Sequence, residues 1–338
     1  MPEAWFELSP KDRTEVLYLA ADRTGRAAHV LEKDVWVVWA LSVLYGSKLA
    51  DVLTFKGATS LSKVYKVIDR VSEDVDPTYD IRKFVPDMLP EGESLPKSRR
   101  QMRNITDAVR KKLPLWYQES LIPVFQQAIP ETNSEVSIKC DGNPNVVAIV
   151  YPALVSGTGY VARRIQLEFG ARATGEPNTR FDVYCDAASA VPEIMFPTAT
   201  PVVMKLERTF WEKATLAHVY CRQDKFRGGY RFSRHWYDLA AIAKSSHINS
   251  LIADGELAND VAQHQACFFR ENDDSGHPID YVSAVNGEIE LIPDGDALKT
   301  LDTDYDAMID DGLLEEGSPT FNEIVDTCRG IEKRINDR

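Results

Sequence analysis

The segment between residues 52 and 79 constrains the fold more than any other part of the chain, because two kinds of secondary structure alternate within it. VLTF at 52–55 has the composition of a short buried strand, and KGAT at 56–59 predicts a turn. A stripe of apolar residues with a 3.6-residue period follows at 61–68 and indicates a helix. The chain is then extended again up to residue 79. The first compact unit is therefore strand–turn–helix–strand, and its second strand carries acidic residues.

The rest of the chain predicts an α+β fold in which a mixed-sheet lobe precedes a mainly helical lobe. Residues 32–50 are apolar nearly all round and indicate a buried helix. Residues 136–186 are β-branched and alternate in the manner of strands, whereas the periodicity beyond about residue 200 is helical. We expect the sheet lobe over residues 1–198 and the helical lobe over residues 199–338.

Two details complete this prediction. A polar insert at about residues 80–135 is expected to be helical, with Pro114 and Pro123 interrupting its helix. Near the C-terminus, EIELI at 288–292 is expected to form a short strand inside a region rich in Gly and Asp.

The net charge of −13 does not exclude a nucleic-acid partner, because the charge is concentrated in one stretch. Residues 271–317 contain fifteen Asp or Glu and one basic residue, so this stretch carries −14 and the rest of the chain +1. It is most simply a solvated surface, and a contact for a basic partner is the alternative. Basic residues are dense from Lys97 to Lys112 and from residue 201 to 240. Such clusters are either solvated helix faces or phosphate contacts.

The cysteines and the apolar runs predict a cytoplasmic protein that does not span a membrane. Cys140, Cys185, Cys221, Cys267 and Cys328 lie far apart, and an odd, scattered set is typical of reduced thiols. No run of about 18 apolar residues is present, as a membrane span requires. The N-terminus lacks a basic start followed by an apolar core, so we expect no signal peptide.

Acidic side chains alternate along the second strand of the first unit. Ser72, Asp74 and Asp76 would share one face of a strand, and Val71 and Val75 would face the core. Neighbouring carboxylates repel one another, so the group is typical of a site where a cation neutralises it. Mg²⁺ suits such ligands, because it binds one or two carboxylates and completes its shell with phosphate oxygens. An acidic surface strand without a ligand explains the same pattern.

The turn before this strand has the properties of a phosphate-binding turn. Backbone N–H groups at a helix start attract anions, and Gly57 lets a ligand approach the backbone closely. Thr59 or Ser60 is also expected to cap the helix. The residues expected to bind nucleotide phosphates are Lys56, Gly57, Thr59, Ser60 and Ser72, together with Lys213.

Three charged residues farther along the chain are candidates for the same site. Glu168 lies on the polar face of a predicted strand and would be the third carboxylate, which activates an attacking oxygen; an ordinary exposed Glu is the alternative. Lys213 falls in the apolar stripe of a helix, so it either extends to solvent or faces an anion. Asp238 follows Arg234 at the spacing of an intrahelical ion pair.

In their order and spacing these motifs resemble a known family. FKGATSLSKVYKVIDRVSEDVD is similar to the FKGGTSL…RxSxDhD signature of the AbiEii/AbiGii (MenT-like) toxins, in the DNA polymerase β-type nucleotidyltransferase superfamily. Glu212-Lys213 and the later RHWYDL are similar to the family's EK…RxxYDL pair. The series FFR…DY…GEIELIP…DYDAM…PTFNEIV matches one branch of it. Ala58 departs from the usual second Gly, and Pro77 directly follows Asp76.

The resemblance, which runs from about residue 30 to 335, implies an enzyme with the nucleotidyltransferase fold. An NTP would be held by the turn at 57–60 and by Ser72, with Mg²⁺ on Asp74, Asp76 and Glu168. Lys213 would stabilise charge on the triphosphate. Asp238 would act in the site by orienting Lys213 or the nucleotide.

The resemblance also implies partners. The acceptor would be the 3′ end of an RNA such as tRNA, and the cluster at 97–112 would contact that RNA. The chain would be the toxin of a toxin–antitoxin or abortive phage-defence system, with a cognate antitoxin. Two alternatives remain at this point. One is nucleotidylyl transfer to a hydroxyl of a protein or small molecule, and the other is a non-catalytic nucleotide-binding protein.

Overall fold

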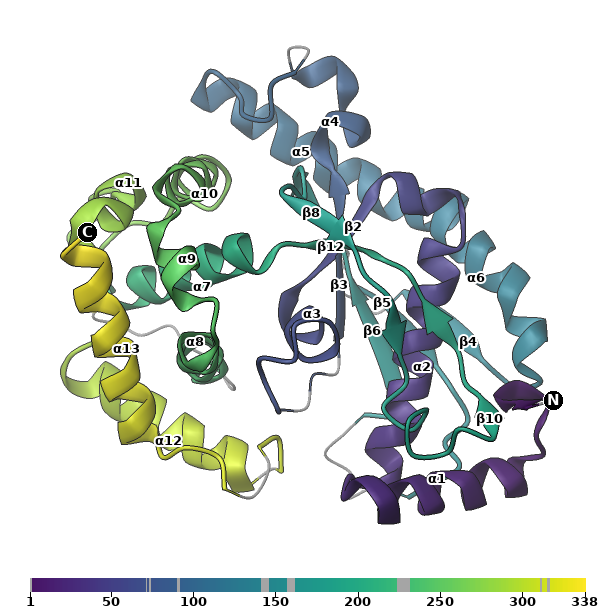
Figure 1. Cartoon of the computed structure of the whole chain (residues 1–338). Helices are drawn as coiled ribbons and strands as arrows, with labels where there is room; N and C mark the ends of the chain where they lie inside the picture. The colour runs from purple at the N-terminus through teal and green to yellow at the C-terminus, as the bar shows by residue number, and fades with distance from the viewer. Residues whose placement is uncertain are drawn as a thin grey trace. The chain divides into compact units, whose positions relative to one another are not determined.

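The computed structural model of the chain divides into two compact units. The first unit comprises Met1–Val64, Ser72–Ser94 and Asn104–Met204, and the second comprises Tyr65–Val71, Leu95–Arg103 and Lys205–Arg338. The structure describes residues 2–70, 72, 74–89, 92–140, 146–156, 162–223, 232–310, 312–314 and 317–338. The first unit contains the sheet and the second is helical (Figure 1).

A mixed sheet forms the centre of the first unit. Its described strands are β2 (Leu53–Lys56), β3 (Asp74–Asp80), β4 (Ser137–Cys140), β5 (Val146–Val150), β6 (Arg164–Glu168), β7 (Gly170–Ala173), β8 (Asn178–Arg180) and β12 (Val202–Met204). Their order is β4-β5-β6-β3-β2-β12-β8, and β7 also pairs with β3. β3 is antiparallel to β2 and parallel to β6, so the acidic strand lies inside the sheet and not at its edge. This mixed sheet with many helices confirms the predicted fold class.

Short strands and helices complete the first unit. They are β1 (Glu3–Ala4), β9 (Val183–Tyr184), β10 (Ile194–Met195), β11 (Thr198–Ala199), α1 (Pro10–Thr24), α2 (Ala28–Tyr45), α3 (Gly57–Lys63), α4 (Ile81–Phe84) and α6 (Ile122–Ala128). Helix α5 (Arg99–Trp116) begins in the second unit and continues into the first. Helix α2 contacts α1, α6 and β6, as Figure 1 shows on one side of the sheet.

Helix α2 is the apolar helix that the sequence predicted, although it begins earlier and ends at Tyr45. Val35, Val38 and Leu41 are completely buried, and each such side chain stabilises the fold by about 1.5–3 kcal/mol. The charged start of the helix is buried as well. Glu32 accepts hydrogen bonds from the backbone N–H groups of residues 154 and 155, at 2.7 and 3.2 Å. These bonds explain how a carboxylate enters the core.

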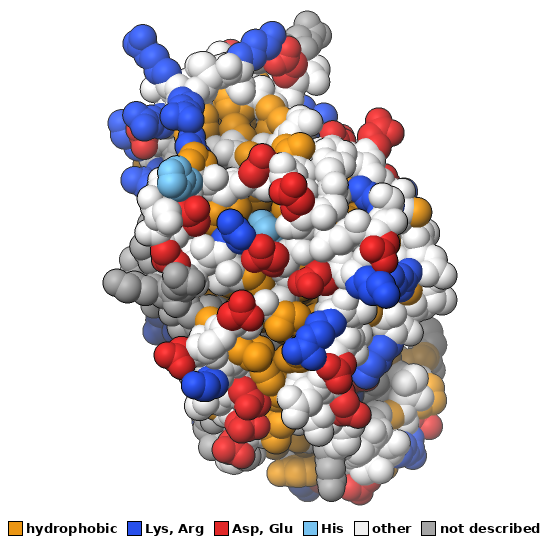
Figure 2. Space-filling model, turned by 90° about the vertical axis from the view of Figure 1, so that its left-hand side faces the viewer, with side chains coloured by type: hydrophobic (Ala, Val, Ile, Leu, Met, Phe, Trp, Pro, Cys, Tyr) orange, Lys and Arg blue, Asp and Glu red, His pale blue; other side chains and the backbone are white. Residues whose placement is uncertain are grey.

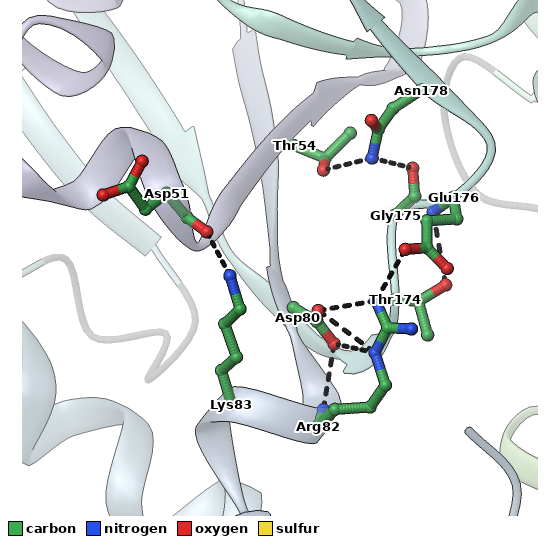
Figure 3. A network of polar contacts seen from close by, with 9 residues as sticks. All are labelled: Asp51, Thr54, Asp80, Arg82, Lys83, Thr174, Gly175, Glu176 and Asn178. Atoms are coloured by element: carbon green, nitrogen blue, oxygen red, sulfur yellow. Dashed lines mark hydrogen bonds and ion pairs between the residues drawn. The ribbon is translucent and has the colours of Figure 1, made fainter. Parts of the chain in front are cut away.

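A polar network fixes the C-terminal end of β3 (Figure 3). Arg82 donates to both oxygens of Asp80, with a 2.8 Å bond from Nη2, and to Glu176 Oε1 at 2.7 Å. Gly175 has φ +79°, and a Cβ there would lie 2.6 Å from Thr54 Cβ. The loop before β8 is therefore held against β2 and the end of β3.

The prolines of the insert change the helix without ending it. Helix α5 runs through Pro114, and a π-helical turn, Tyr117–Leu121, joins it to α6, where Pro123 lies in the first turn. Pro114 removes one N–H from the ladder, and the wider turn that follows absorbs the disruption. The predicted interruption is therefore wrong for Pro114.

The second unit is built from α7 (Leu206–Cys221), α8 (Arg234–Lys244), α9 (Ile248–Ala253), α10 (Gly255–Phe268), α11 (Tyr281–Ser283), α12 (Gly295–Asp310) and α13 (Phe321–Asn336). The strand predicted at 288–292 is wrong. Side chains bind its backbone instead: Asn336 Oδ1 accepts from the N–H of residue 289, His218 Nδ1 from 290 and Glu332 Oε2 from 291. An extended segment whose N–H groups are satisfied in this way needs no partner strand.

The acidic stretch is mainly on the surface. Asp296, Asp302, Asp306 and Asp310 are exposed on α12. Figure 2 shows acidic side chains dispersed over one face, with apolar side chains between them and a group of basic side chains at the upper end. In the part of the chain that the structure describes, no helix is both long and apolar enough to cross a membrane.

Candidate active site

Gly57 and Asp76 are held in direct contact where β2 turns into α3. Gly57 has φ +79°, a backbone conformation that favours glycine. A Cβ at this position would collide with Oδ2 of Asp76 and lie 2.8 Å from its Cγ. The register of the sheet adds Lys56, which is the partner of Asp76 across the antiparallel pair. The predicted glycine turn and one predicted metal ligand therefore meet.

The three predicted carboxylates lie on neighbouring strands. Asp74 and Asp76 alternate with Val75, which is completely buried, so both acids lie on the opposite face of β3. Asp74 is paired with Gln166 of the parallel strand β6. Glu168 is two residues farther along and exposed, so continuing this register places it opposite Asp76 on the same face.

Gln166 supports this arrangement and was not predicted as part of the site. In the amide orientation that satisfies both neighbours, Gln166 donates to Asp74 Oδ1 at 3.2 Å and accepts from Arg164 at 3.2 Å. An uncharged donor beside Asp74 orients its carboxylate without cancelling its charge. Gln166 lies two residues before Glu168 on the same face of β6, and no pattern in the sequence indicates its bond to Asp74.

The acidic face suits a cation that needs additional ligands from the substrate. Among the described residues, no group of three or more Asp, Glu, His or Cys side chains is arranged to hold a metal ion. Mg²⁺ does not require such a cage, because it usually takes one or two carboxylates and fills its shell with water and phosphate oxygens. The oxygens of Asp74 and Asp76, with Glu168 opposite, match that chemistry.

The hydroxyl groups of the turn form an internal network. Thr59 Oγ1 donates to the backbone carbonyl of Asp74 and lies 2.7 Å from Ser72 Oγ. Since Thr59 has only one hydroxyl proton, Ser72 must be the donor to Thr59. Ser60 Oγ donates to the carbonyl of Gly57 at 2.7 Å, and both Thr59 and Ser60 are buried.

This network corrects two expectations. The N-cap of α3 is Lys56, which makes no side-chain cap bond, so the expected cap at Thr59 or Ser60 is wrong. β3 begins at Asp74, so Ser72 precedes the strand and is held by Thr59 instead of by the pleat. Val71, expected to face the core, lies outside the described residues.

In the second unit, Lys213 and Asp238 form a buried ion pair. Lys213 Nζ lies 2.8 Å from Asp238 Oδ2, and the Asp238 side chain is completely buried. Arg70 binds the same carboxylate at both oxygens, Nε to Oδ1 at 2.7 Å and Nη2 to Oδ2 at 2.8 Å. Asp238 therefore pairs with α7 and with the segment before β3, and not with Arg234 as in the alternative of an intrahelical ion pair.

The two cations determine the charge state of Asp238. Burial alone would raise the pKa of this carboxyl, but the charges and hydrogen bonds of Arg70 and Lys213 outweigh burial and hold it well below its usual range. Burial lowers the pKa of Lys213, and Arg70 acts in the same direction against Asp238. Lys213 is thus an oriented, largely desolvated ammonium group.

A second buried ion cluster, in the first unit, was not predicted. Lys63, the last residue of α3, lies 2.5 Å from Asp34 Oδ1 and 2.7 Å from Asp186 Oδ1, with its side chain 6% exposed. Asp186 also binds Arg26, and its N–H donates to Asp34 at 2.6 Å. The cluster attaches the end of α3 to α2 and to the loop after β9.

Sequence separation explains why these partners were missed. Arg70 and Asp238 are 168 residues apart, and Lys63 and Asp186 are 123 apart. The available signal was indirect: Lys213 in an apolar stripe and Asp34 in an apolar helix each need a buried counter-charge. The pattern indicates that a partner exists but not which residue it is.

A solved structure shares the fold of the chain. The fold is similar to that of MenT4, a nucleotidyltransferase toxin from Mycobacterium tuberculosis, with a TM-score of 0.51 and 15% sequence identity. The match covers 95% of this chain and 90% of that one. The chain, with the mixed sheet that carries Asp74 and Asp76, is therefore similar in fold to a nucleotidyltransferase toxin.

The family follows from the sequence. The family model described as "Nucleotidyl transferase AbiEii toxin, Type IV TA system" matches residues 39–327. The chain belongs to this family and is a nucleotidyltransferase toxin, which confirms the predicted family and enzyme class. No curated protein matches the chain.

Proposed function

We propose that the chain transfers a nucleoside monophosphate from an NTP to the 3′ end of an RNA such as tRNA, in a reaction that depends on Mg²⁺. The contact between Gly57 and the Asp76 carboxylate supports this proposal most strongly. The bare glycine lets the Asp76 carboxylate approach the start of α3, so a cation bound by Asp76 would lie beside the N–H groups that attract phosphate.

Asp74, Asp76 and Glu168 would hold the metal, which neutralises phosphate charge when it is bound. The turn at Gly57–Ser60 would bind phosphate oxygens through the N–H groups of its first residues, which have no acceptor one helical turn earlier. Ser72 and Lys56 would complete this phosphate contact.

The transfer itself uses Glu168 and Lys213. Glu168 would accept the proton of the RNA hydroxyl, whose oxygen attacks the α-phosphorus in line. The bond from the α-phosphorus to the bridging oxygen breaks, and pyrophosphate leaves. Lys213 would stabilise the charge that develops on the departing phosphates, with Asp238 and Arg70 fixing its position.

Helix α5 supports an RNA acceptor. All seven basic residues between 97 and 112 are exposed, namely Lys97, Arg99, Arg100, Arg103, Arg110, Lys111 and Lys112. Phosphate contacts release counterions, so RNA affinity should fall steeply with salt. Changing Arg99, Arg100 and Arg103 to Gln should reduce the salt slope by about two to three. Lys11→Gln, on the exposed face of α1, is the control; an unchanged slope in the triple variant would remove α5 from the interface.

The proposed biology follows from this chemistry. Since NTPs and tRNA are cytoplasmic, the enzyme would act there. Blocking tRNA 3′ ends would arrest growth, as an abortive response to phage requires, and a cognate antitoxin would be needed for survival. Measuring plaque formation with and without the Asp76→Asn variant tests this role.

A label-transfer assay tests the reaction. Purified protein is incubated with Mg²⁺, each α-labelled NTP in turn, and total tRNA. We expect label on RNA with at least one NTP, and its loss with EDTA, with Asp76→Asn and with Lys213→Met. Asp87→Asn, an exposed acid of the same unit, is the control and should retain activity.

Oxidising the tRNA with periodate distinguishes the acceptor position, because it destroys the 3′ diol. Loss of labelling after oxidation supports the 3′ end. Label on protein, or on a small molecule with a free hydroxyl, would replace RNA as the acceptor. No transfer with any NTP would contradict the proposed reaction.

A further inference from the structure

His235, the second residue of α8, has a buried ring nitrogen that the proposed function does not use. Its Nδ1 is inaccessible to solvent and has no hydrogen-bond partner among the described residues, although the residue as a whole is only half-buried. Buried polar atoms are normally paired, and an unpaired one costs stability. An unpaired nitrogen at this position therefore leaves a hydrogen bond that the described residues do not supply.

The charges around this ring are mostly positive. Lys213 on α7, Arg234 on α8 and Arg70 from the segment before β3 act on it, and Asp238 is the one opposing charge among them. All of these residues belong to the second unit. Three cations against one carboxylate leave a formal surplus of +2 around a largely desolvated imidazole. Such a surplus attracts an anion.

The same surroundings fix the state of the ring in the free protein. Burial first, and then the nearby cations, lower the pKa of His235 well below its usual value, so the ring is neutral at pH 7. A proton on Nδ1 would have no acceptor, so the neutral ring carries its proton on Nε2. An anion beside the ring would favour protonation of Nδ1 in two ways. Its charge offsets the nearby cations, and it accepts a hydrogen bond from Nδ1.

We propose that His235 is a phosphate ligand that takes up a proton on Nδ1 when the triphosphate binds and gives it back when pyrophosphate leaves. This inference rests on the proposed function, because it takes the anion to be the triphosphate that Lys213 contacts. The proton comes from solvent and returns to solvent, so the overall transfer is unchanged. Triphosphate affinity then increases as pH falls from about 8 to 6, by at most tenfold per pH unit.

Calorimetry measures this proton directly. Inorganic tripolyphosphate, with Mg²⁺, is titrated into the full chain in buffers that differ in ionisation enthalpy, at pH 6.5, 7.5 and 8.5. The dependence of the binding heat on the buffer gives the number of protons taken up. The wild type should take up as much as one proton more than His235→Asn, which keeps a polar group near Nδ1 but cannot titrate. His247→Asn, an exposed histidine on the same unit, should match the wild type.

The outcomes separate this inference from the function on which it rests. Equal proton uptake in wild type and His235→Asn, with intact binding, overturns the inference and leaves the nucleotidyl transfer standing. A difference in proton uptake without transfer to any acceptor supports His235 and contradicts the function. Absence of tripolyphosphate binding to the wild type overturns the inference, and the label-transfer assay then decides the function separately. If His235→Asn does not fold, NMR of the His235 ring in the wild type, with and without tripolyphosphate, decides by showing whether the ring becomes protonated.

Discussion

At the scale of single residues, two positions have conformations that leave little freedom for substitution. Gly57 is restricted by its positive φ and by the carboxylate of Asp76, and Asp238 is restricted by two cations. Each restriction can be tested against a control residue. Gly92 has the same positive φ without a neighbouring side chain among the described residues, and Asp326 forms an ion pair that is exposed.

Gly57→Ala should reduce nucleotidyl transfer at least ~100-fold, because its Cβ displaces the Asp76 carboxylate and a shift of about 1 Å in a reacting group has that effect. Gly92→Ala is the matched control. Gly92 also has φ +79°, but no described atom lies within 4 Å of its Cβ position. It should lose about 1 kcal/mol of stability and keep its activity. Equal transfer rates for the two variants would contradict the assignment of Gly57.

Asp238→Asn should lower the free energy of unfolding by about 3–5 kcal/mol at pH 7, since it leaves Arg70 and Lys213 without a counter-charge. The pKa of Asp238 is lowered in the folded protein, so its contribution is complete above about pH 4 and is lost as the pH falls below that. Urea unfolding at pH 7, 5 and 3.5 should show a shallower acid dependence in the variant.

The control for Asp238 is Asp326→Asn. That residue forms an exposed ion pair with Arg329 at 2.9 Å, and its removal should change stability by no more than about 0.5 kcal/mol. A loss at Asp238 as small as the loss at Asp326 would show that the buried network contributes little.

At the scale of elements, the sequence predicted what local pattern determines. The apolar run at 32–50 and the alternation at 136–186 are each a property of neighbouring residues, and both predictions agree with α2 and with strands β4 to β9. The EIELI prediction was wrong because the pattern of a strand is present while its hydrogen-bond partners are side chains of His218, Glu332 and Asn336.

The candidate site likewise contains residues that local pattern identified and partners that it did not identify. Asp74, Asp76 and Gly57 were identified from adjacent positions, and the structure brings the last two together. The ion pairs around the site join residues that are distant in sequence. Arg70 pairs with Asp238, and Lys63 at the end of α3 pairs with Asp186. A single sequence shows that a buried charge needs a partner, but the choice of partner is made by the tertiary fold.

The C-terminal end of helix α3 carries one such buried charge, Lys63, whose partners are distant in sequence. Lys63→Met should lower the free energy of unfolding by about 3–5 kcal/mol, because Asp34 is then buried without its cation, and of the cations described beside Asp186 only Arg26 remains. Lys11→Met, which removes an exposed pair with Glu15 at 3.7 Å, should cost about 0.5 kcal/mol or less. Chemical denaturation measures both. Similar losses for the two variants would mean that the cluster around Lys63 is not a structural anchor.

At the scale of the whole molecule, the proposed reaction draws on residues of both units. Asp76 belongs to the first unit and Lys213 to the second. If they act on one triphosphate, Asp76→Asn and Lys213→Met should each slow transfer strongly, and the double variant should be no slower than the slower single one, as for groups that work together. Single-turnover rates provide the measurement. Rate losses that multiply would indicate two independent steps.

The contact between Gly57 and Asp76 also has a genetic consequence. A cell that survives its own toxin needs only one inactivating base change, and the acidic codons are the obvious targets. Any change of the Gly57 codon to another amino acid adds at least a Cβ, which collides with the Asp76 carboxylate. Among survivors selected for resistance, mutations at Gly57 should therefore recur beside those at Asp74 and Asp76, even though glycine has no side chain to contribute to the reaction.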